Sequence, residues 1–334
     1  MAAYSLSNAG AFLSHSGIAV LYPHLFGVFM PAVMMVGPFL YLYVLSLTVP
    51  GFRLKRAHAF HLLPFLLTEA LFISFFYFRS AAFKADFIAG NHAGVWPWIF
   101  EACLWLRIPV LLGYLALSGL ALRKYAHTVR ENFSALERVS LNWLKLLVAA
   151  YGVGFVAVVT LAQVDVPDTV LHIAETIIIL VIGLRGMTQP EIFSRGPTAA
   201  GDVRPAVKYE RSALTKDQAE RAERLLVAVM ENDRLYLKED LSLADLAGKI
   251  GLAASYVSQV LNERLNKNFY DFVNSYRIAE AQRILRDPRR GDQKILAIAL
   301  DCGFASKAAF NRVFKRHSGL TPTEYKAGST SPAR

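Results

Sequence analysis

The residues with the clearest chemical potential are polar and basic side chains that recur at helical spacing near the C-terminal end of the chain. A first segment, 254–265, offers Ser255, Tyr256, Ser258, Gln259 and Asn262. A second segment, 306–317, is more basic and offers Ser306, Lys307, Asn311, Arg312, Lys315 and Arg316. Such side chains hydrogen-bond to base edges, and the cations neutralise phosphates. Together they indicate contact with double-stranded DNA, although a solvated helix surface competes as the interpretation of any single residue.

Each polar segment follows a short predicted helix and a glycine, which is the order of a helix-turn-helix motif. Ala247 stands four residues before Gly251, and Ala299 stands four residues before Gly303. The turn needs glycine because the chain there takes a positive φ, and the small alanine lets the two helices cross. Ser242 opens an S-x-x-D capping pattern for the first helix. The apolar positions of the second motif fall one residue later, so its turn is expected to be one residue longer.

Two such motifs, 52 residues apart, flank a predicted helix over 268–285. In this pattern the C-terminal part of the chain resembles the AraC/XylS family of transcription regulators over about 238–326. The matching residues are Ala247, Gly251, Phe272, Arg277, Ala281, Leu285, Ala299, Gly303, Phe304, Phe310, Phe314, Gly319, Thr321, Pro322 and Tyr325. The resemblance implies two recognition helices that enter successive major-groove segments on one face of DNA. More loosely, Gly37, Pro38 and the stretches 41–47 and 184–193 resemble the membrane-bound branch of that family.

Composition separates an apolar half from a charged half. The chain is 54% hydrophobic with a mean hydropathy of +0.34, yet residues 205–334 contain 22 of its 36 Lys and Arg and 16 of its 26 Asp and Glu. Five runs in the other half approach the roughly 20 apolar residues that span a bilayer. They are 25–47, 60–78, 95–122, 144–162 and 169–184, and a sixth, 9–21, is about half of a span. Five runs with few charges between them favour membrane spans over the buried helices of a soluble core.

The distribution of Lys and Arg between the runs gives an orientation. The loop 51–59, the loop after residue 122 and the end of the last run are basic, whereas 163–168 has no Lys or Arg. Alternating basic loops predict a multi-pass protein of the inner membrane whose C-terminal part lies in the cytoplasm. If 9–21 spans, there are six spans and Met1 is cytoplasmic. Otherwise there are five and Met1 lies outside.

Several ionisable residues fall within the apolar runs, where a charge is costly and usually has a partner or a function. They are Glu69, Glu101, Arg107, His172 and Glu175. A ligand-sensing role for this set competes with a structural Glu69–Arg107 pair that only sets helix packing.

We therefore predict an all-α protein: a polytopic transmembrane helix bundle over 1–188, a linker over 189–215, a double helix-turn-helix domain over 216–328 and a disordered tail over 329–334. The predicted function is a membrane-anchored, sequence-specific DNA-binding regulator, which is not an enzyme. With two well-separated cysteines, Cys103 and Cys302, we expect no disulfide, metal site or cofactor. Expected partners are double-stranded DNA, membrane lipid and an unidentified small-molecule or protein signal, with RNA polymerase and a second copy of the chain as further candidates. Two alternatives stay open: an integral-membrane enzyme or transporter with an appended regulatory domain, and an anchor without a sensing role.

Overall fold

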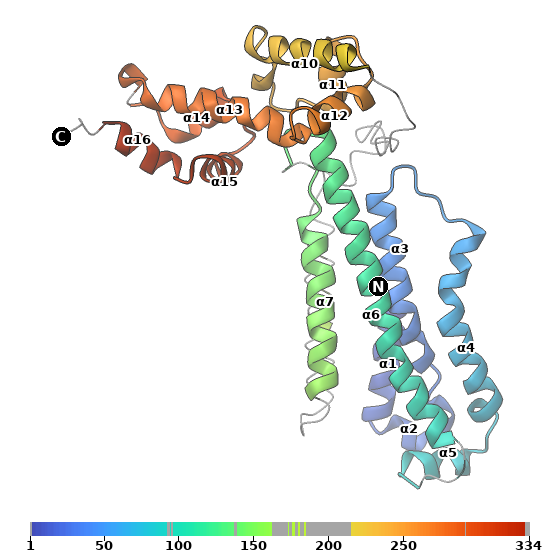
Figure 1. Ribbon diagram of the computed structural model, residues 1–334. Helices are drawn as coiled ribbons and strands as arrows, with labels where there is room; N and C mark the ends of the chain where they lie inside the picture. The colour runs from blue at the N-terminus through green and yellow to red at the C-terminus, as the bar shows by residue number, and fades with distance from the viewer. Residues whose placement is uncertain are drawn as a thin grey trace. The chain divides into compact units, whose positions relative to one another are not determined.

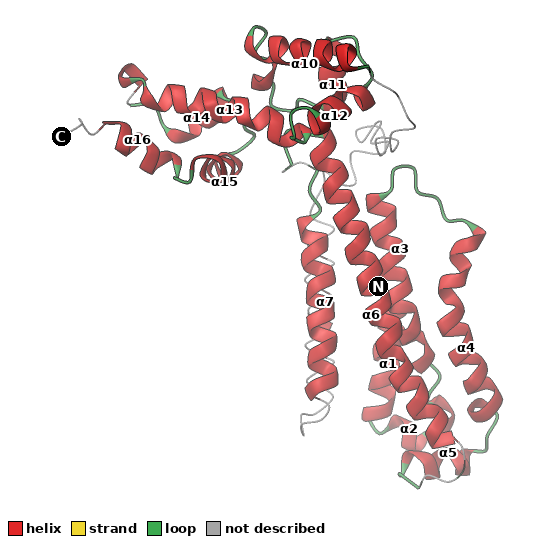
Figure 2. Ribbon diagram, in the orientation of Figure 1, coloured by secondary structure: helices red, strands yellow, loops and turns green. Residues whose placement is uncertain are grey.

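Helices form nearly all of the regular structure. The computed structural model describes residues 2–91, 94, 96–136, 139–161, 215–290 and 292–330, together with 173, 176, 177, 180 and 184. Within these residues there is no strand beyond one isolated antiparallel bridge between Phe133 and Ser242 (Figure 2). The predicted all-α class is confirmed.

The chain divides into two compact units, which we describe separately. Unit 1 consists of Met1–Arg123 with Leu141–Ala199, and unit 2 consists of Lys124–Ser140 with Ala200–Arg334. The predicted boundaries did not anticipate that 124–140, which lie between two apolar helices, group with the C-terminal residues. The predicted linker, 189–215, lies outside the described residues except for Thr215.

Unit 1 is a set of apolar helices, most of which are labelled in Figure 1. They are α1 (Ala2–His15), α2 (Ile18–Leu21), α3 (Val36–Thr48), α4 (Leu63–Phe72), α5 (Ala81–Ile88), α6 (Trp96–Asn132, whose last residues belong to unit 2) and α7 (Asn142–Leu161). Short 3-10 turns over Pro23–Leu25, Met30–Met35 and Arg56–Leu62 and a π-turn over Ile73–Tyr77 connect or extend them.

Three segments are long and apolar enough to cross a membrane, judged by length and composition. These are Pro23–Thr48, Arg56–Tyr77 and Pro97–Asn132, which correspond to the first three predicted spans. The fourth predicted span coincides with α7, whose apolar helical stretch Asn142–Ala157 is shorter, and most of the fifth lies outside the described residues. The half-span 9–21 is not one helix, because α1 ends at His15 and Gly17 has a φ of 76°.

Small residues and aromatic rings pack the helices of unit 1. A Cβ at Gly37 of α3 would lie 3.1 Å from the Cβ of Tyr114 on α6, so glycine permits this close approach. At Gly152 of α7 a Cβ would lie 3.5 Å from the Cδ1 of Leu115 on α6, which is an ordinary van der Waals contact. Glycine at helix contacts is typical of membrane bundles. A separate cluster, built around the buried rings of Phe72 and Phe76, fills the space near α5.

Unit 2 contains two hydrophobic clusters joined by one long helix. Its helices are α10 (Lys216–Glu231), α11 (Leu243–Lys249), α12 (Ala254–Glu263), α13 (Phe269–Arg286), α14 (Ile295–Asp301), α15 (Lys307–Ser318) and α16 (Pro322–Thr330). The first cluster is formed by α10 to α12 and the start of α13, and the second by the rest of α13 with α14 to α16. Figure 1 shows α13 running from one group of helices to the other.

Candidate nucleic-acid interface

The first helix-turn-helix is built from α11, a turn at Gly251 and α12. Ser242 caps α11, because its hydroxyl accepts the backbone N–H of Asp245 at 3.1 Å while the Asp245 carboxylate accepts the N–H of Ser242 at 3.1 Å. Gly251 has a φ of 70°, as the motif requires. Ala247 is buried where α11 meets α12. The predicted capping, turn and helix crossing are therefore confirmed.

The second helix-turn-helix repeats this construction with α14 and α15. Gly303 has a φ of 80°, and a Cβ there would lie 2.8 Å from the carbonyl oxygens of both Tyr236 and Leu237. Five residues, 302–306, separate α14 from α15, whereas four, 250–253, separate α11 from α12. The turn is longer by one residue, as predicted. Ser306 caps α15 by accepting the N–H of Ala309 at 3.1 Å.

Arg277 of α13 holds the two halves of unit 2 together from inside. Its side chain is 1% exposed. Its Nε donates to the Tyr236 carbonyl at 2.7 Å, and one Nη donates to the Lys238 carbonyl at 2.7 Å. The guanidinium also lies over the Phe304 ring, 5.7 Å from its centroid. Because a buried cation is costly without such acceptors, these contacts fix the chain before α11 and the turn after α14 on the same helix.

The polar face of α15 is the most basic surface that sequence predicted. Lys307, Arg312, Lys315 and Arg316 are exposed on it. Arg316 pairs with Asp271 of α13, with 3.1 Å between the nitrogen and oxygen. Asn311 is half-buried, and its Oδ1 has no hydrogen-bond partner in the described residues. An amide at this place can pair with adenine, and the cations beside it can neutralise phosphates.

The polar face of α12 is less open than expected. Ser255 and Tyr256 are exposed, and Gln259 and Asn262 are half-buried. Ser258, which was expected on the exposed face, is only 3% exposed. Glu131, near the end of α6, contacts this face, because its Oε2 accepts from the Asn262 Nδ2 at 3.1 Å and from the Ser258 Oγ at 3.4 Å. An acidic side chain therefore contacts the first predicted recognition helix.

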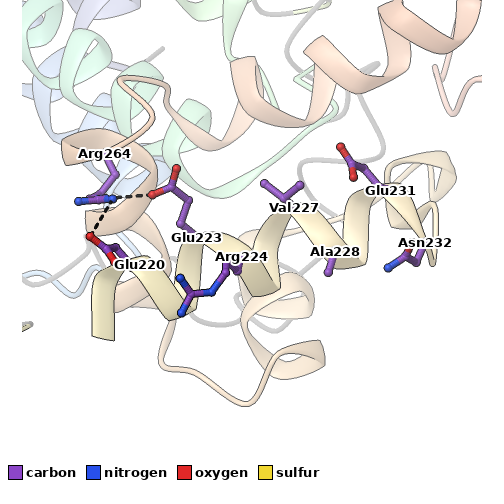
Figure 3. A pocket seen from close by; sticks show the side chains of 8 residues that line it. All are labelled: Glu220, Glu223, Arg224, Val227, Ala228, Glu231, Asn232 and Arg264. Carbon is purple, nitrogen blue, oxygen red and sulfur yellow. Dashed lines mark hydrogen bonds and ion pairs between the residues drawn. The ribbon is translucent and has the colours of Figure 1, made fainter. Parts of the chain in front are cut away.

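A shallow hollow of about 460 Å³ lies on unit 2 beside α10 (Figure 3). It does not include the basic face of α15. It is lined by α10 residues and by Arg264, the C-cap of α12. Arg264 pairs with Glu223 at 2.9 Å and with Glu220 at 3.8 Å, as the dashed lines in Figure 3 mark. These ion pairs connect α10 to the end of α12.

The residues predicted to lie within membrane spans form a less coherent group. The Glu69 carboxylate accepts from the Tyr77 hydroxyl at 3.3 Å, so within the described part of the chain it has a partner other than the expected Arg107. Glu101 is exposed and Arg107 half-buried, while His172 and Glu175 lie outside the described residues. Sequence reasoning missed Lys84, which is 1% exposed and donates to the Tyr77 carbonyl at 2.9 Å. Across the described positions, no three His, Cys, Asp or Glu side chains are grouped as metal ligands would be.

Comparison with known proteins finds relatives for the C-terminal part of the chain. The family described as a helix-turn-helix domain matches residues 246–328. An uncharacterized helix-turn-helix-type transcriptional regulator of Staphylococcus aureus (strain COL) is 38% identical over 92 residues, which are 28% of this chain and 12% of that protein. The probable transcription factor PqrA of Proteus vulgaris is 29% identical over 99 residues, which are 30% of this chain and 79% of that protein.

Among solved structures, a transcriptional regulator described as AraC-type from Chromobacterium violaceum is similar at 23% identity with a TM-score of 0.31, covering 35% of this chain and 99% of the other. The sequence matches support a helix-turn-helix DNA-binding domain at the C-terminal end, similar to domains of transcription regulators. None of these named proteins is described as an enzyme. The matches cover only the C-terminal part of the chain, so they leave unit 1 unassigned.

Proposed function

We propose that this protein is a membrane-anchored transcription regulator that binds specific DNA sequences through its two helix-turn-helix motifs and receives a signal through its apolar helices. The observation that carries the DNA-binding part is the pair of motifs built on α11–α12 and α14–α15, with glycine turns at positive φ and polar faces on the second helices. The proposal for the whole chain adds the apolar helices of unit 1 to this domain.

The two polar faces suit different parts of DNA recognition. The cations of α15 neutralise phosphates, which gives affinity and a strong dependence on salt. Asn311 on α15 and Gln259 on α12 supply amides that can bond base edges, which gives sequence preference. In such motifs the second helix lies in the major groove, and two motifs on one chain reach neighbouring groove segments when they are one helical turn, about 34 Å, apart.

The membrane part rests on length, composition and exposure. Besides three segments with span-like length, unit 1 exposes large apolar side chains, among them Leu67 of α4, Trp105 of α6 and Val153 of α7. Apolar surfaces of this extent are unfavourable in water and are favourable against lipid. Basic loops around 51–59 and after 122 favour a cytoplasmic C-terminal part, where DNA is available.

Two experiments test the proposal. A reporter enzyme that is active only outside the cytoplasm should be active when fused after Asp165 and inactive when fused after Arg56 or Arg130. The full chain in detergent micelles should select duplexes from a random-sequence pool, and its affinity should fall steeply with salt. The reverse fusion pattern refutes the membrane topology. Failure to enrich any sequence at low salt refutes the function.

A further inference from the structure

A short stretch that begins in the last residues of α6 is docked on the DNA-binding helices, although more than a hundred residues separate them in sequence. We call residues 131–136 the docking segment. They belong to unit 2, together with α10 to α16. Phe133 forms an antiparallel bridge with Ser242, the N-cap of α11, and Leu136 packs against the second hydrophobic cluster. Nothing in the function proposed above requires this contact.

Ser134 is the anchor of the docking segment. It is 2% exposed. Its N–H and its hydroxyl both donate to the Leu241 carbonyl, at 3.2 and 2.7 Å. Its hydroxyl oxygen accepts from Arg277 at 3.2 Å, and its carbonyl accepts from Asn274 at 3.3 Å. All three polar groups of one residue thus bond to the DNA-binding domain, which is a specific arrangement and not a loose surface contact.

Glu131 uses this anchorage to reach α12. Its carboxylate is 15% exposed and accepts from both Asn262 and Ser258, as described above. A phosphate or a base acceptor would need the same amide and hydroxyl donors. A carboxylate and a phosphate also repel each other when both are near one donor, because both are anions. Glu131 therefore occupies donors that DNA would need on α12.

We propose that the docking segment is an intramolecular inhibitor: it holds Glu131 on the first recognition helix, and DNA binds when the segment leaves. The proposal rests on the DNA-binding function proposed above and adds its regulation. The docking segment continues α6, whose last residue is Asn132. A change in α6 therefore alters the position of Glu131, which gives the apolar helices a direct covalent route to the DNA-binding surface.

The first test removes the carboxylate. The probe is a duplex selected from a random-sequence pool by the full chain with Glu131→Ala in detergent micelles. Glu131→Ala should bind this duplex roughly tenfold more tightly than the unmodified chain, which corresponds to about 1.4 kcal/mol. The matched control is Asp86→Ala, which deletes the same charge from an exposed position on α5 in unit 1. The control should bind like the unmodified chain. Equal affinity of the Glu131→Ala and Asp86→Ala chains overturns the proposal.

The second test locks the segment in place. Residues bridged across antiparallel strands have Cα atoms about 4.5–5.5 Å apart, which lies within the range of a disulfide. The chain with Phe133→Cys and Ser242→Cys is compared with itself, oxidised and reduced, so the loss of the Ser242 cap affects both states equally. The two native cysteines, Cys103 and Cys302, are buried. Oxidation should lower affinity for the duplex at least about tenfold, and reduction should restore it.

The outcomes distinguish failure of the inhibitor proposal from failure of the proposed DNA-binding function. If the cross-link forms, as shown by mass spectrometry, and the oxidised chain binds as tightly as the reduced one, then DNA and the docked segment are bound together and the inhibitor proposal is wrong. In that case the DNA-binding function still stands. If neither the unmodified chain nor Glu131→Ala selects any duplex, the proposed function itself fails.

Discussion

Gly303 should be far less replaceable than Gly251, although the two glycines hold equivalent places in the two motifs. Both have a positive φ, of 80° and 70°. An alanine in the left-handed region costs about 1–2 kcal/mol wherever it stands. A Cβ at Gly251 meets nothing within 4 Å, whereas one at Gly303 meets two backbone oxygens at 2.8 Å. We therefore expect a second cost at Gly303 only.

The size of that second cost follows from what the oxygens do. The carbonyl of Tyr236 accepts the Arg277 Nε at 2.7 Å, so it is not free to move away. Forcing a methyl group into a packed site costs about 1–3 kcal/mol. Gly303→Ala should therefore lower the free energy of unfolding by about 2–5 kcal/mol, and Gly251→Ala by about 1–2 kcal/mol. The whole free energy of unfolding of a small domain is only about 5–15 kcal/mol.

The assay is urea unfolding of the fragment 212–334, followed by circular dichroism at 222 nm. The fragment contains every buried residue of both hydrophobic clusters. Cys302 is its one thiol, and burial, with Glu280 and Asp301 nearby, raises its pKa to about 12, so alkylation of this thiol reports unfolding independently. Coincident transitions justify a two-state treatment. Equal destabilisation by the two substitutions, or a larger effect at Gly251, would refute the steric reasoning.

The remaining predictions concern charge and DNA contact. Hydrogen bonds from Arg283 and Arg234 lower the pKa of Glu280, so its stabilisation is present above the unfolded value of about 4.3 and is lost as the pH falls through the lower folded value. Glu280→Gln should therefore cost about 1.5–3 kcal/mol at pH 7, and its urea midpoint should converge with that of the unmodified fragment as the pH falls below the folded pKa of Glu280; a constant difference would contradict this. Arg312→Ala should weaken binding to all duplexes and reduce the salt slope by about 1, whereas Asn311→Ala should relax preference at one base pair by about 1–3 kcal/mol, both measured by fluorescence anisotropy across a panel of duplexes. Identical behaviour of the two variants would contradict the assigned roles.

The helix-turn-helix domain could be predicted from sequence because its signals are local. The capping serine, the glycine turn and the extra residue of the second turn are each encoded within a few neighbouring positions, and the structure confirms all three. A local signal of the same kind marks the start of α10, where Thr215 and Gln218 form a reciprocal cap. Hydropathy likewise located the first three span-like segments.

Contacts between distant residues could not be predicted in this way. Nothing near Ser134 in the sequence points to Arg277, which lies 143 positions away. The family resemblance singles out Arg277, but its burial follows only from the carbonyl groups that gather around it. Glu69 shows the same limit: its predicted depth in a membrane suggested Arg107 as a partner, whereas its carboxylate accepts from the Tyr77 hydroxyl. The helices and their polar faces could therefore be predicted from sequence, but not that Glu131 contacts the polar face of α12.

The hydrogen bonds around the docking segment are arranged so that the segment can leave without leaving buried donors unpaired. If Ser134 withdraws, Arg277 retains the carbonyls of Tyr236 and Lys238, both at 2.7 Å. Asn274 retains the carbonyl of Tyr270 at 2.9 Å. An unsatisfied buried donor costs about 1–3 kcal/mol, and release of the segment avoids that cost at both side chains. The docked and released states can then lie close in free energy, which is the condition under which a modest displacement of α6, or the arrival of DNA, shifts the balance between them.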